Sequence, residues 1–225
     1  MTAPLDNIIW HTLCGAHVKF STGTDRARRY APGFSPILGF VEPSSPDLAA
    51  IAPYCARGEH FYCAHWSGPA PAGWTIEAES TMFQMVWSGD APARDEAADA
   101  VPLDSRHAEQ AVGLATLTRP GPFGLRTLEL GDYFGCFDGP RLVAMAGERM
   151  CADGFREISG VCTHPEYQGR GYARRLMLKL IHRELHRGET PFLHVMRDNA
   201  GAWQFYERMG FRKRQEPIVR VIART

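Results

Sequence analysis

The residues best suited to binding an anionic ligand lie in one short stretch, His164 to Ala173. It reads His-Pro-Glu-Tyr-Gln-Gly-Arg-Gly-Tyr-Ala and follows an apolar run at residues 158–163. The glycines at 169 and 171 leave backbone N–H groups uncovered by side chains, and the first turn of a helix adds partial positive charge. An apolar strand, a glycine loop and a helix start in this order predict a pyrophosphate cradle built from the amides of residues 169–174.

The segment after this loop has the pattern of an amphipathic helix. Its apolar residues recur at spacings of three and four: Ala173, Leu176, Met177, Leu180, Ile181 and Leu185. Basic residues cover the other side, and only Leu178 interrupts them. Gly188 is placed to end the helix in a left-handed conformation. The glycine loop is therefore expected to open a helix rather than to form an isolated turn.

Two other nucleotide-binding loops fit the sequence poorly. A dinucleotide fingerprint needs a third small residue, and position 174 is an arginine. The phosphate loop of nucleoside triphosphatases needs Gly-Lys-Ser/Thr, which the stretch lacks. Because there is also only one strand–loop–helix unit, a nicotinamide-binding oxidoreductase is disfavoured.

The remaining pattern, Gln168-x-x-Gly171-x-Ala173, resembles the Arg/Gln-x-x-Gly-x-Gly/Ala loop of the GNAT superfamily of acyl-CoA-dependent N-acyltransferases. Further motifs of that family follow in order, and they are an apolar strand at 191–196, Asn199, Tyr206 and Gly210-Phe211. The resemblance covers roughly the last half of the chain. It implies a GNAT fold, an α/β architecture with a mixed sheet, and acetyl-CoA as cosubstrate without a metal.

The resemblance also assigns a donor site. In the family, the strand before the loop and the strand after the helix splay apart, and the pantetheine arm of CoA enters the gap. By resemblance, the backbone of Val161, Cys162 and Thr163 meets the acetyl and pantetheine end, and Asn199 hydrogen-bonds the arm. The pyrophosphate falls to the loop residues Gln168, Gly169, Arg170, Gly171, Tyr172, Ala173 and Arg174. Asparagine at a helix start is equally an ordinary cap, and the two roles can coexist.

Transfer to an alkyl amine requires removal of a proton. Such an amine has a pKa near ~10.4, so deprotonation at pH 7 costs about 4.6 kcal/mol. The resemblance makes Glu157, on the strand before the loop, the first candidate base, and Glu129 is the second. Glu157 can instead form a salt bridge at the strand end, and Glu129 can be an exposed surface residue. Alternation places Glu157 and Val161 on one strand face if no bulge intervenes.

Tyr206 is the candidate acid for the departing thiolate. It lies two helical turns beyond Asn199 and matches the family tyrosine. A phenol can protonate or hydrogen-bond a thiolate, whose thiol has a pKa near ~8.5. The alternative is an aromatic residue that packs on its helix face. Because amine and thioester can react directly once aligned, Cys162 is not expected to be a nucleophile.

The composition limits which partners and which cell compartment we expect for the protein. The 225 residues carry zero formal net charge and are 44% hydrophobic, so no overall field favours nucleic acid or membrane. No stretch approaches the ~20 apolar residues of a membrane span, and the start lacks a signal-peptide pattern. Two groups, His11/Cys14/His17 and Cys55/His60/Cys63/His65, lack zinc-finger spacing. We expect a cytoplasmic monomer or homodimer with reduced cysteines and no metal.

The chain divides into three parts by pattern. Residues 1–90 predict a smaller α+β domain, with a helix start near Ile8, a helix capped by Asp47, and strands at 61–66 and 75–87. This domain is interpreted as a degenerate GNAT-like copy, with an unrelated α+β cap as the alternative. Residues 91–99 predict an exposed linker.

Residues 100–225 predict the GNAT domain itself. A first strand at 101–103 and a helix capped by Asp104 come before a Gly/Pro-rich loop. Strands at 132–137 and 141–150 flank an Asp-Gly hairpin turn, and the central strand runs from Phe155 to His164.

The sequence therefore predicts an N-acetyltransferase that uses acetyl-CoA and a primary amine of a small molecule, amino acid or peptide. The amine would attack the thioester directly in a ternary complex. A module that binds acyl-CoA without catalysis, for example as a regulator, is the alternative.

Overall fold

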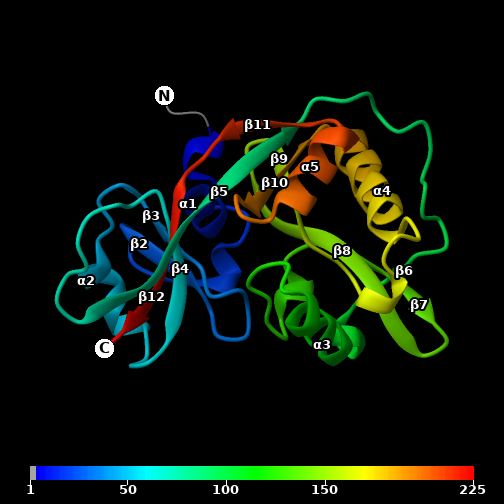
Figure 1. Ribbon diagram of the computed structural model, residues 1–225. Coiled ribbons are helices and arrows are strands. Elements are labelled where there is room, and N and C mark those ends of the chain that lie inside the picture. Colours follow the sequence, from blue (N-terminus) through cyan, green and yellow to red (C-terminus); the bar gives the residue numbers. More distant parts are fainter. Residues whose placement is uncertain (1–3) are drawn as a thin grey trace.

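A mixed sheet of nine strands runs through the computed structural model, which describes residues 4–225 (Figure 1). The strands are, in sheet order, β4 (His60–Ala64), β12 (Ile218–Arg224), β5 (Trp74–Trp87), β10 (Thr190–Met196), β9 (Phe155–Thr163), β8 (Arg141–Ala152), β7 (Tyr133–Asp138) and β6 (Val101–Pro102), and β11 (Phe211–Gln215) pairs with β5. Strands β9 and β10 are parallel, and the other pairs are antiparallel. A smaller sheet contains β1 (Ser21–Gly23), β2 (Ala27–Tyr30) and β3 (Leu38–Phe40).

Helices cover the sheets. The α-helices are α1 (Ile8–Cys14), α2 (Leu48–Ile51), α3 (Ala108–Thr118), α4 (Tyr172–His186) and α5 (Ala200–Met209). Short 3-10 helices occur at Pro4–Asn7, Val18–Phe20, Ala52–Tyr54, Ser105–His107, Thr127–Glu129 and Pro165–Tyr167. No helix within residues 4–225 is both long and apolar enough to cross a membrane.

Most predicted elements are confirmed at their predicted positions. Asp47 caps α2 by accepting the N–H of Ala50, and Asp104 accepts the N–H of Arg106 before α3. The hairpin between β7 and β8 turns at residues 138–141, and β9 ends at Thr163. The mixed sheet with helices on it agrees with the α/β architecture that the sequence predicted.

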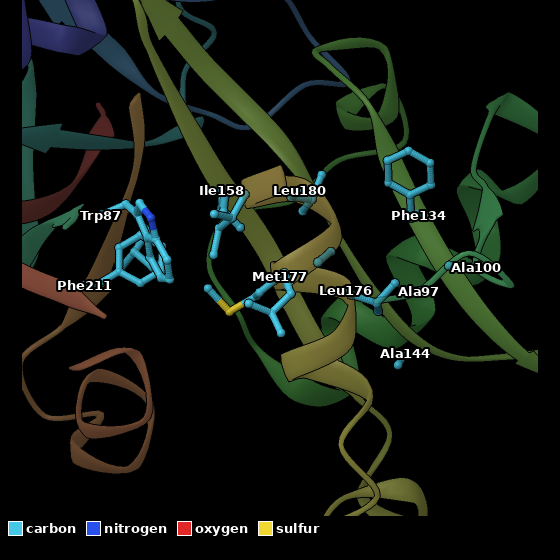
Figure 2. Close-up of a cluster of buried hydrophobic side chains, with 14 of the residues drawn as sticks. Trp87, Ala97, Ala100, Phe134, Ala144, Ile158, Leu176, Met177, Leu180 and Phe211 are labelled. Atoms are coloured by element: carbon cyan, nitrogen blue, oxygen red, sulfur yellow. The ribbon is translucent and has the colours of Figure 1, made fainter. Parts of the chain in front are cut away.

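Helix α4 supplies the core on one face of the sheet. Leu176, Met177, Leu180 and Ile181 are fully buried, as their spacing predicted. Figure 2 shows the first three of these close to Ile158 of β9, with Phe134 of β7 farther along. Each large apolar side chain buried in this way contributes about 1.5–3 kcal/mol relative to exposure. This packing fixes the start of α4 against β9, where the glycine loop lies.

The predicted linker is exposed over much of its length, and it also contacts α4. Ala97 is fully buried, and Nζ of Lys179 lies 2.5 Å from Oδ2 of Asp95 and donates to the carbonyl of Ala97. Its low apolar content suggested exposure, but buried Ala97 and two ion pairs with α4, Lys179–Asp95 and Arg175–Asp99, hold it in place. Lys179, assigned by pattern to the solvent face of the helix, is consequently buried.

Strand β5 crosses from one half of the molecule to the other (Figure 1). Its first part pairs with β12, and from Met82 onward it pairs with β10 and β11. Strands β4 and β5 both precede residue 91, so the large sheet continues across the predicted domain boundary. The division at residues 91–99 and the GNAT-like character of the first part stay predictions.

Strand β9 carries a bulge. Met145 faces Cys162 and Gly147 faces Ser159, so two residues of β9 oppose a single residue of β8. Gly160, inside the bulge, has a φ of 63°, a conformation that favours glycine.

The bulge reverses the alternation of side chains along β9. Ile158 and Val161 both pack with the core beneath α4, and Cys162 packs with the core beneath α3. Glu157, next to Ile158 in the strand, therefore does not share a face with Val161. The shared face expected from simple alternation is wrong for this reason.

Candidate functional site

A cavity of about 550 Å³ lies where β9 and β10 part. The two strands pair only from Phe155 to Glu157 on β9 and from Thr190 to Phe192 on β10. Beyond this point, residues 158–163 of β9 and 193–196 of β10 line the cavity. The splay expected from the family resemblance is thereby confirmed, and it leaves one edge of β9 open over the length of the gap.

The glycine loop follows directly at the end of β9. Gly169 and Gly171 have φ values of 75° and 81°, and a Cβ added at either would meet no atom within 4 Å. Within residues 4–225, the amides from Gly169 to Arg174 have no backbone acceptor, and helical hydrogen bonding begins with the N–H of Arg175 on the Gly171 carbonyl. Free amides beneath an open space fit a phosphate group.

Several side chains of the loop have identifiable positions. Arg170 stacks at 4.7 Å over the ring of Tyr167 and donates to the Glu166 carbonyl. Gln168 links the loop to the cavity, because it lines the cavity and its Nε2 donates to the Thr163 carbonyl. Arg174 is exposed.

Helix α5 forms the opposite side of the gap. Asn199 accepts the N–H of Ala202 at 3.2 Å and so caps the helix, and both Asn199 and Tyr206 line the cavity. Burial, followed by repulsion from Cys162, raises the pKa of Tyr206 to about 12. The sequence placed both residues at the cavity, but their roles stay predictions.

Glu157 is fully buried and is held by three contacts from two residues. Nε and Nη2 of Arg149 bind its two carboxylate oxygens at 2.9 and 2.7 Å, and Nδ1 of His194 lies 2.8 Å from Oε1. Burial alone would raise the pKa of Glu157, but Arg149 and His194 lower it to about 2. Glu157 itself does not line the cavity, whereas Arg149 and His194 do. The geometry disfavours Glu157 as a free base.

His194 was not identified from the sequence as a functional residue. Its Nε2 lies 3.3 Å from the amide nitrogen of Gln84, which also donates to the Leu5 carbonyl. Oε1 of Gln84 accepts from Arg214 and Gln215, which fixes the orientation of the amide. His194 therefore donates through Nδ1 and accepts at Nε2. The only sequence signal for it was a histidine within an otherwise apolar strand.

Glu129 lies outside the cavity lining. It ends a 3-10 helix, its side chain is 41% exposed, and Arg126 binds both carboxylate oxygens at 2.7 and 2.8 Å. The hydrogen bonds from Arg126 lower its pKa. The structure thus does not bring Glu129 together with the other predicted site residues.

Apolar residues close the cavity on the side of the N-terminal half. We call this set the apolar wall; it consists of Ile9, Ile37, Met82, Met150, Val219 and Val221. The set draws on α1, β5, β8, β12 and the segment before β3. No local motif marks these residues, because they are neighbours only in the folded chain.

The two histidine and cysteine groups considered as metal sites do not form one. Within residues 4–225, no group of three or more His, Cys, Asp or Glu side chains is arranged to hold a metal ion. All six cysteines are free, and Cys63 lies in the apolar core around Phe61 and Trp74.

Comparisons with known proteins agree with this architecture. The model of the FR47-like protein family matches residues 133–220, which span β7 to β12 and include the glycine loop. No functionally curated protein matches the chain. A GCN5-related N-acetyltransferase from Kribbella flavida (17% identity, 96% of this chain and 94% of that chain, TM-score 0.60) shares the fold. So does a GCN5-related N-acetyltransferase-like protein from Streptococcus suis (15% identity, 97% and 92%, TM-score 0.60).

A crystal structure from Novosphingobium aromaticivorans is more similar. That protein, assigned to the acetyltransferases of the GNAT family, is 32% identical to this chain, the match covers all of both chains, and the TM-score is 0.89. The agreement extends over the N-terminal half, which the sequence motifs did not cover. Full-length identity at this level together with the shared fold establishes that the chain belongs to the GNAT family of acetyltransferases.

Proposed function

We propose that this protein transfers the acetyl group of acetyl-CoA to a primary amine of a small molecule, amino acid or peptide. The observation that carries the proposal is the open edge of β9, which faces a cavity and ends at a loop of free amides. A pantetheine arm carries amides, so it can add to such an edge as a strand would. A pyrophosphate suits the amides at the start of α4.

The donor residues have distinct tasks in this proposal. The backbone of Val161, Cys162 and Thr163 holds the acetyl and pantetheine end, and Asn199 binds the arm. Gln168, Gly169, Arg170, Gly171, Tyr172, Ala173 and Arg174 form the pyrophosphate loop. Cys162 is 5% exposed, and burial raises the pKa of its thiol to about 12, which suits a strand residue rather than a nucleophile.

The amine then attacks the thioester carbon directly in a ternary complex. Its lone pair forms the new C–N bond, the C–S bond breaks, and the sulfur leaves with that electron pair. One proton leaves nitrogen and one reaches sulfur. Tyr206 lines the cavity, and its high pKa suits a phenol that stays protonated and donates a hydrogen bond to the departing sulfur.

Release of free thiol from acetyl-CoA tests the proposal. We expect the purified chain to release thiol in the presence of one or more amines from a panel of amino acids, polyamines, aminoglycosides, aromatic amines and peptides. The product should be the N-acetylated amine by mass spectrometry. Acetyl-CoA that neither binds nor reacts would refute the proposal.

A non-catalytic acyl-CoA-binding module is the second candidate. One observation favours it, because Glu157 is locked by Arg149 and His194 and Glu129 lies outside the cavity. This candidate predicts calorimetric binding of acetyl-CoA without turnover of any amine.

The setting proposed for the enzyme is the cytoplasm, as a monomer or homodimer. Six free cysteines suit a reducing compartment. Fractionation of cells and light scattering of the purified chain test these two points.

A further inference from the structure

The cavity offers an incoming ammonium group little to pair with. Its apolar wall carries no charge, and its cationic side chains are Arg119 and Arg149. Asp198 is the one carboxylate in the lining formed by residues 4–225, and it is an exposed residue of the turn between β10 and α5. An exposed carboxylate is a weak anchor for a cation, about 0–1 kcal/mol. A cationic acceptor would thus lose its hydration without gaining a buried partner.

The buried polar groups beside the wall are not free to accept a proton. Glu157 uses both carboxylate oxygens on Arg149 and shares one with His194. His194 uses Nδ1 on Glu157 and Nε2 on Gln84, whose amide orientation is fixed. Protonation of His194 at Nε2 would therefore turn a hydrogen bond into a contact between two donors.

The Cys63 and Cys162 thiols and the Tyr206 phenol, all in the lining, already carry their protons at neutral pH. Burial raises the pKa of Cys63 and of Cys162 to about 12, and the pKa of Tyr206 is also about 12. These groups can donate hydrogen bonds, but they do not act as bases near pH 7. The lining formed by residues 4–225 thus holds a donor for the leaving sulfur, and its one carboxylate, Asp198, is exposed rather than buried beside the apolar wall.

The number of protons on the acceptor nitrogen decides whether the reaction needs an added base. An uncharged amine loses one proton as its C–N bond forms, and the sulfur gains one proton as the C–S bond breaks. The two balance, with Tyr206 placed to pass the proton, so no additional base is required. An ammonium ion carries one proton more, and for an alkyl amine its removal at pH 7 costs about 4.6 kcal/mol.

We infer that the acceptor is a weakly basic amine on an apolar body, bound in its uncharged form. Aromatic amines and the N-terminal α-amino groups of peptides with an apolar first residue belong to this class. Aromatic amines are almost wholly unprotonated at pH 7, and a peptide α-amino group, with a pKa of about 7.7–8.0, is unprotonated to roughly a tenth. Polyamines, aminoglycosides and lysine side chains do not. The inference rests on the proposed acetyltransferase function and narrows its acceptor.

A pair of isomeric amines tests the inference. 4-Ethylaniline and 2-phenylethylamine contain the same atoms and the same ring, but only the second is an ammonium ion at pH 7. We expect kcat/KM at pH 7 to be at least tenfold higher for 4-ethylaniline. The value for 2-phenylethylamine should rise about tenfold per pH unit between pH 6.5 and 8.5, following its free-amine fraction, while that for 4-ethylaniline stays level.

Equal or better use of 2-phenylethylamine or of spermidine at pH 7 would overturn the inference and leave the proposed function intact. Absence of turnover with every amine, while acetyl-CoA binds, would instead overturn the proposed function.

The Asp198→Asn variant tests whether the one carboxylate in the lining binds an ammonium group. We expect kcat/KM for both isomers to change by less than about twofold, and a tenfold rise in KM confined to 2-phenylethylamine would show ammonium pairing and contradict the inference.

Discussion

The two ends of the cavity are built in different ways. The donor end is a run of backbone atoms, formed by the open edge of β9 and the amides before α4. The acceptor end is made of side chains, namely the apolar wall and the buried chain Arg149–Glu157–His194–Gln84. Residues 158–174 supply most of the donor end. The acceptor end needs α1, β5, β8, β10 and β12 together.

This difference determines how each end responds to mutation. Backbone donors depend on side chains only where a side chain would fill the space, as at Gly169 and Gly171. A buried polar network depends on every member, because removing one leaves its partner desolvated and unpaired. We therefore expect the donor end to lose binding with little loss of stability, and the acceptor end to lose stability first.

Replacement of Arg149 should have the largest effect. The Arg149→Met variant leaves Glu157 buried without its cation, so the free energy of unfolding should fall by about 3–5 kcal/mol in urea denaturation. The double variant with Glu157→Gln removes both charges and should recover at least half of this loss. A single variant as stable as the wild type would show that the acceptor end does not depend on this pair.

Acid should weaken the same pair. The folded pKa of Glu157, about 2, lies below the ordinary value near ~4.3, so its contribution is fully present above pH ~4.3 and is lost as the pH falls toward 2. The stability difference between wild type and the double variant should consequently change as the pH falls from 6 to 3, in the direction that favours the double variant. A pH-independent difference would mean that the pair does not set the acid response.

Tyr206 lines the cavity, and its loss should affect turnover more than binding. We expect Tyr206→Phe to lower kcat about 100-fold, within the range of general-acid effects, and to change the Kd for acetyl-CoA by less than about twofold. Steady-state kinetics and calorimetry measure the two quantities. A variant that turns over at the wild-type rate would remove Tyr206 from the mechanism.

A matched pair of glycine variants, one before and one after α4, tests the donor end of the cavity. Gly171 and Gly188 flank α4, have φ values of 81° and 73°, and both have open space at the Cβ position. Gly171→Trp should raise the Kd for acetyl-CoA about 30-fold, since it blocks an anion site worth up to ~2 kcal/mol. Gly188→Trp carries the same backbone strain and should leave the Kd unchanged. Equal Kd values for the two variants would contradict the cradle.

The sequence predicted the donor end because local patterns determine it. The helix stripe, the loop glycines and the Asn199 cap are all readable within a few residues. The bulge in β9 was not predicted, although Gly160 was a signal for it, because period-two alternation assumes an unbroken ladder.

The acceptor end could not be predicted, because its contacts join residues far apart in the chain. Gln84 and His194 are 110 positions apart. Glu157 was recognised as important, but its role depended on Arg149, and no local pattern showed that the two side chains pair. The contact between the linker and α4 was missed for a similar reason, since Lys179 lies 84 positions from Asp95.

The position of β12 has a consequence for how the protein is made. Strand β12 lies between β4 and β5, yet residues 218–224 leave the ribosome long after both of those strands. Until then β4 and β5 have no partner along their facing edges. The rest of β5 also stays unpaired until β10 has been synthesised. Nascent chains should therefore stay dependent on chaperones late into translation. A fragment of residues 100–225 would leave β10 and β12 uncovered and prone to self-association.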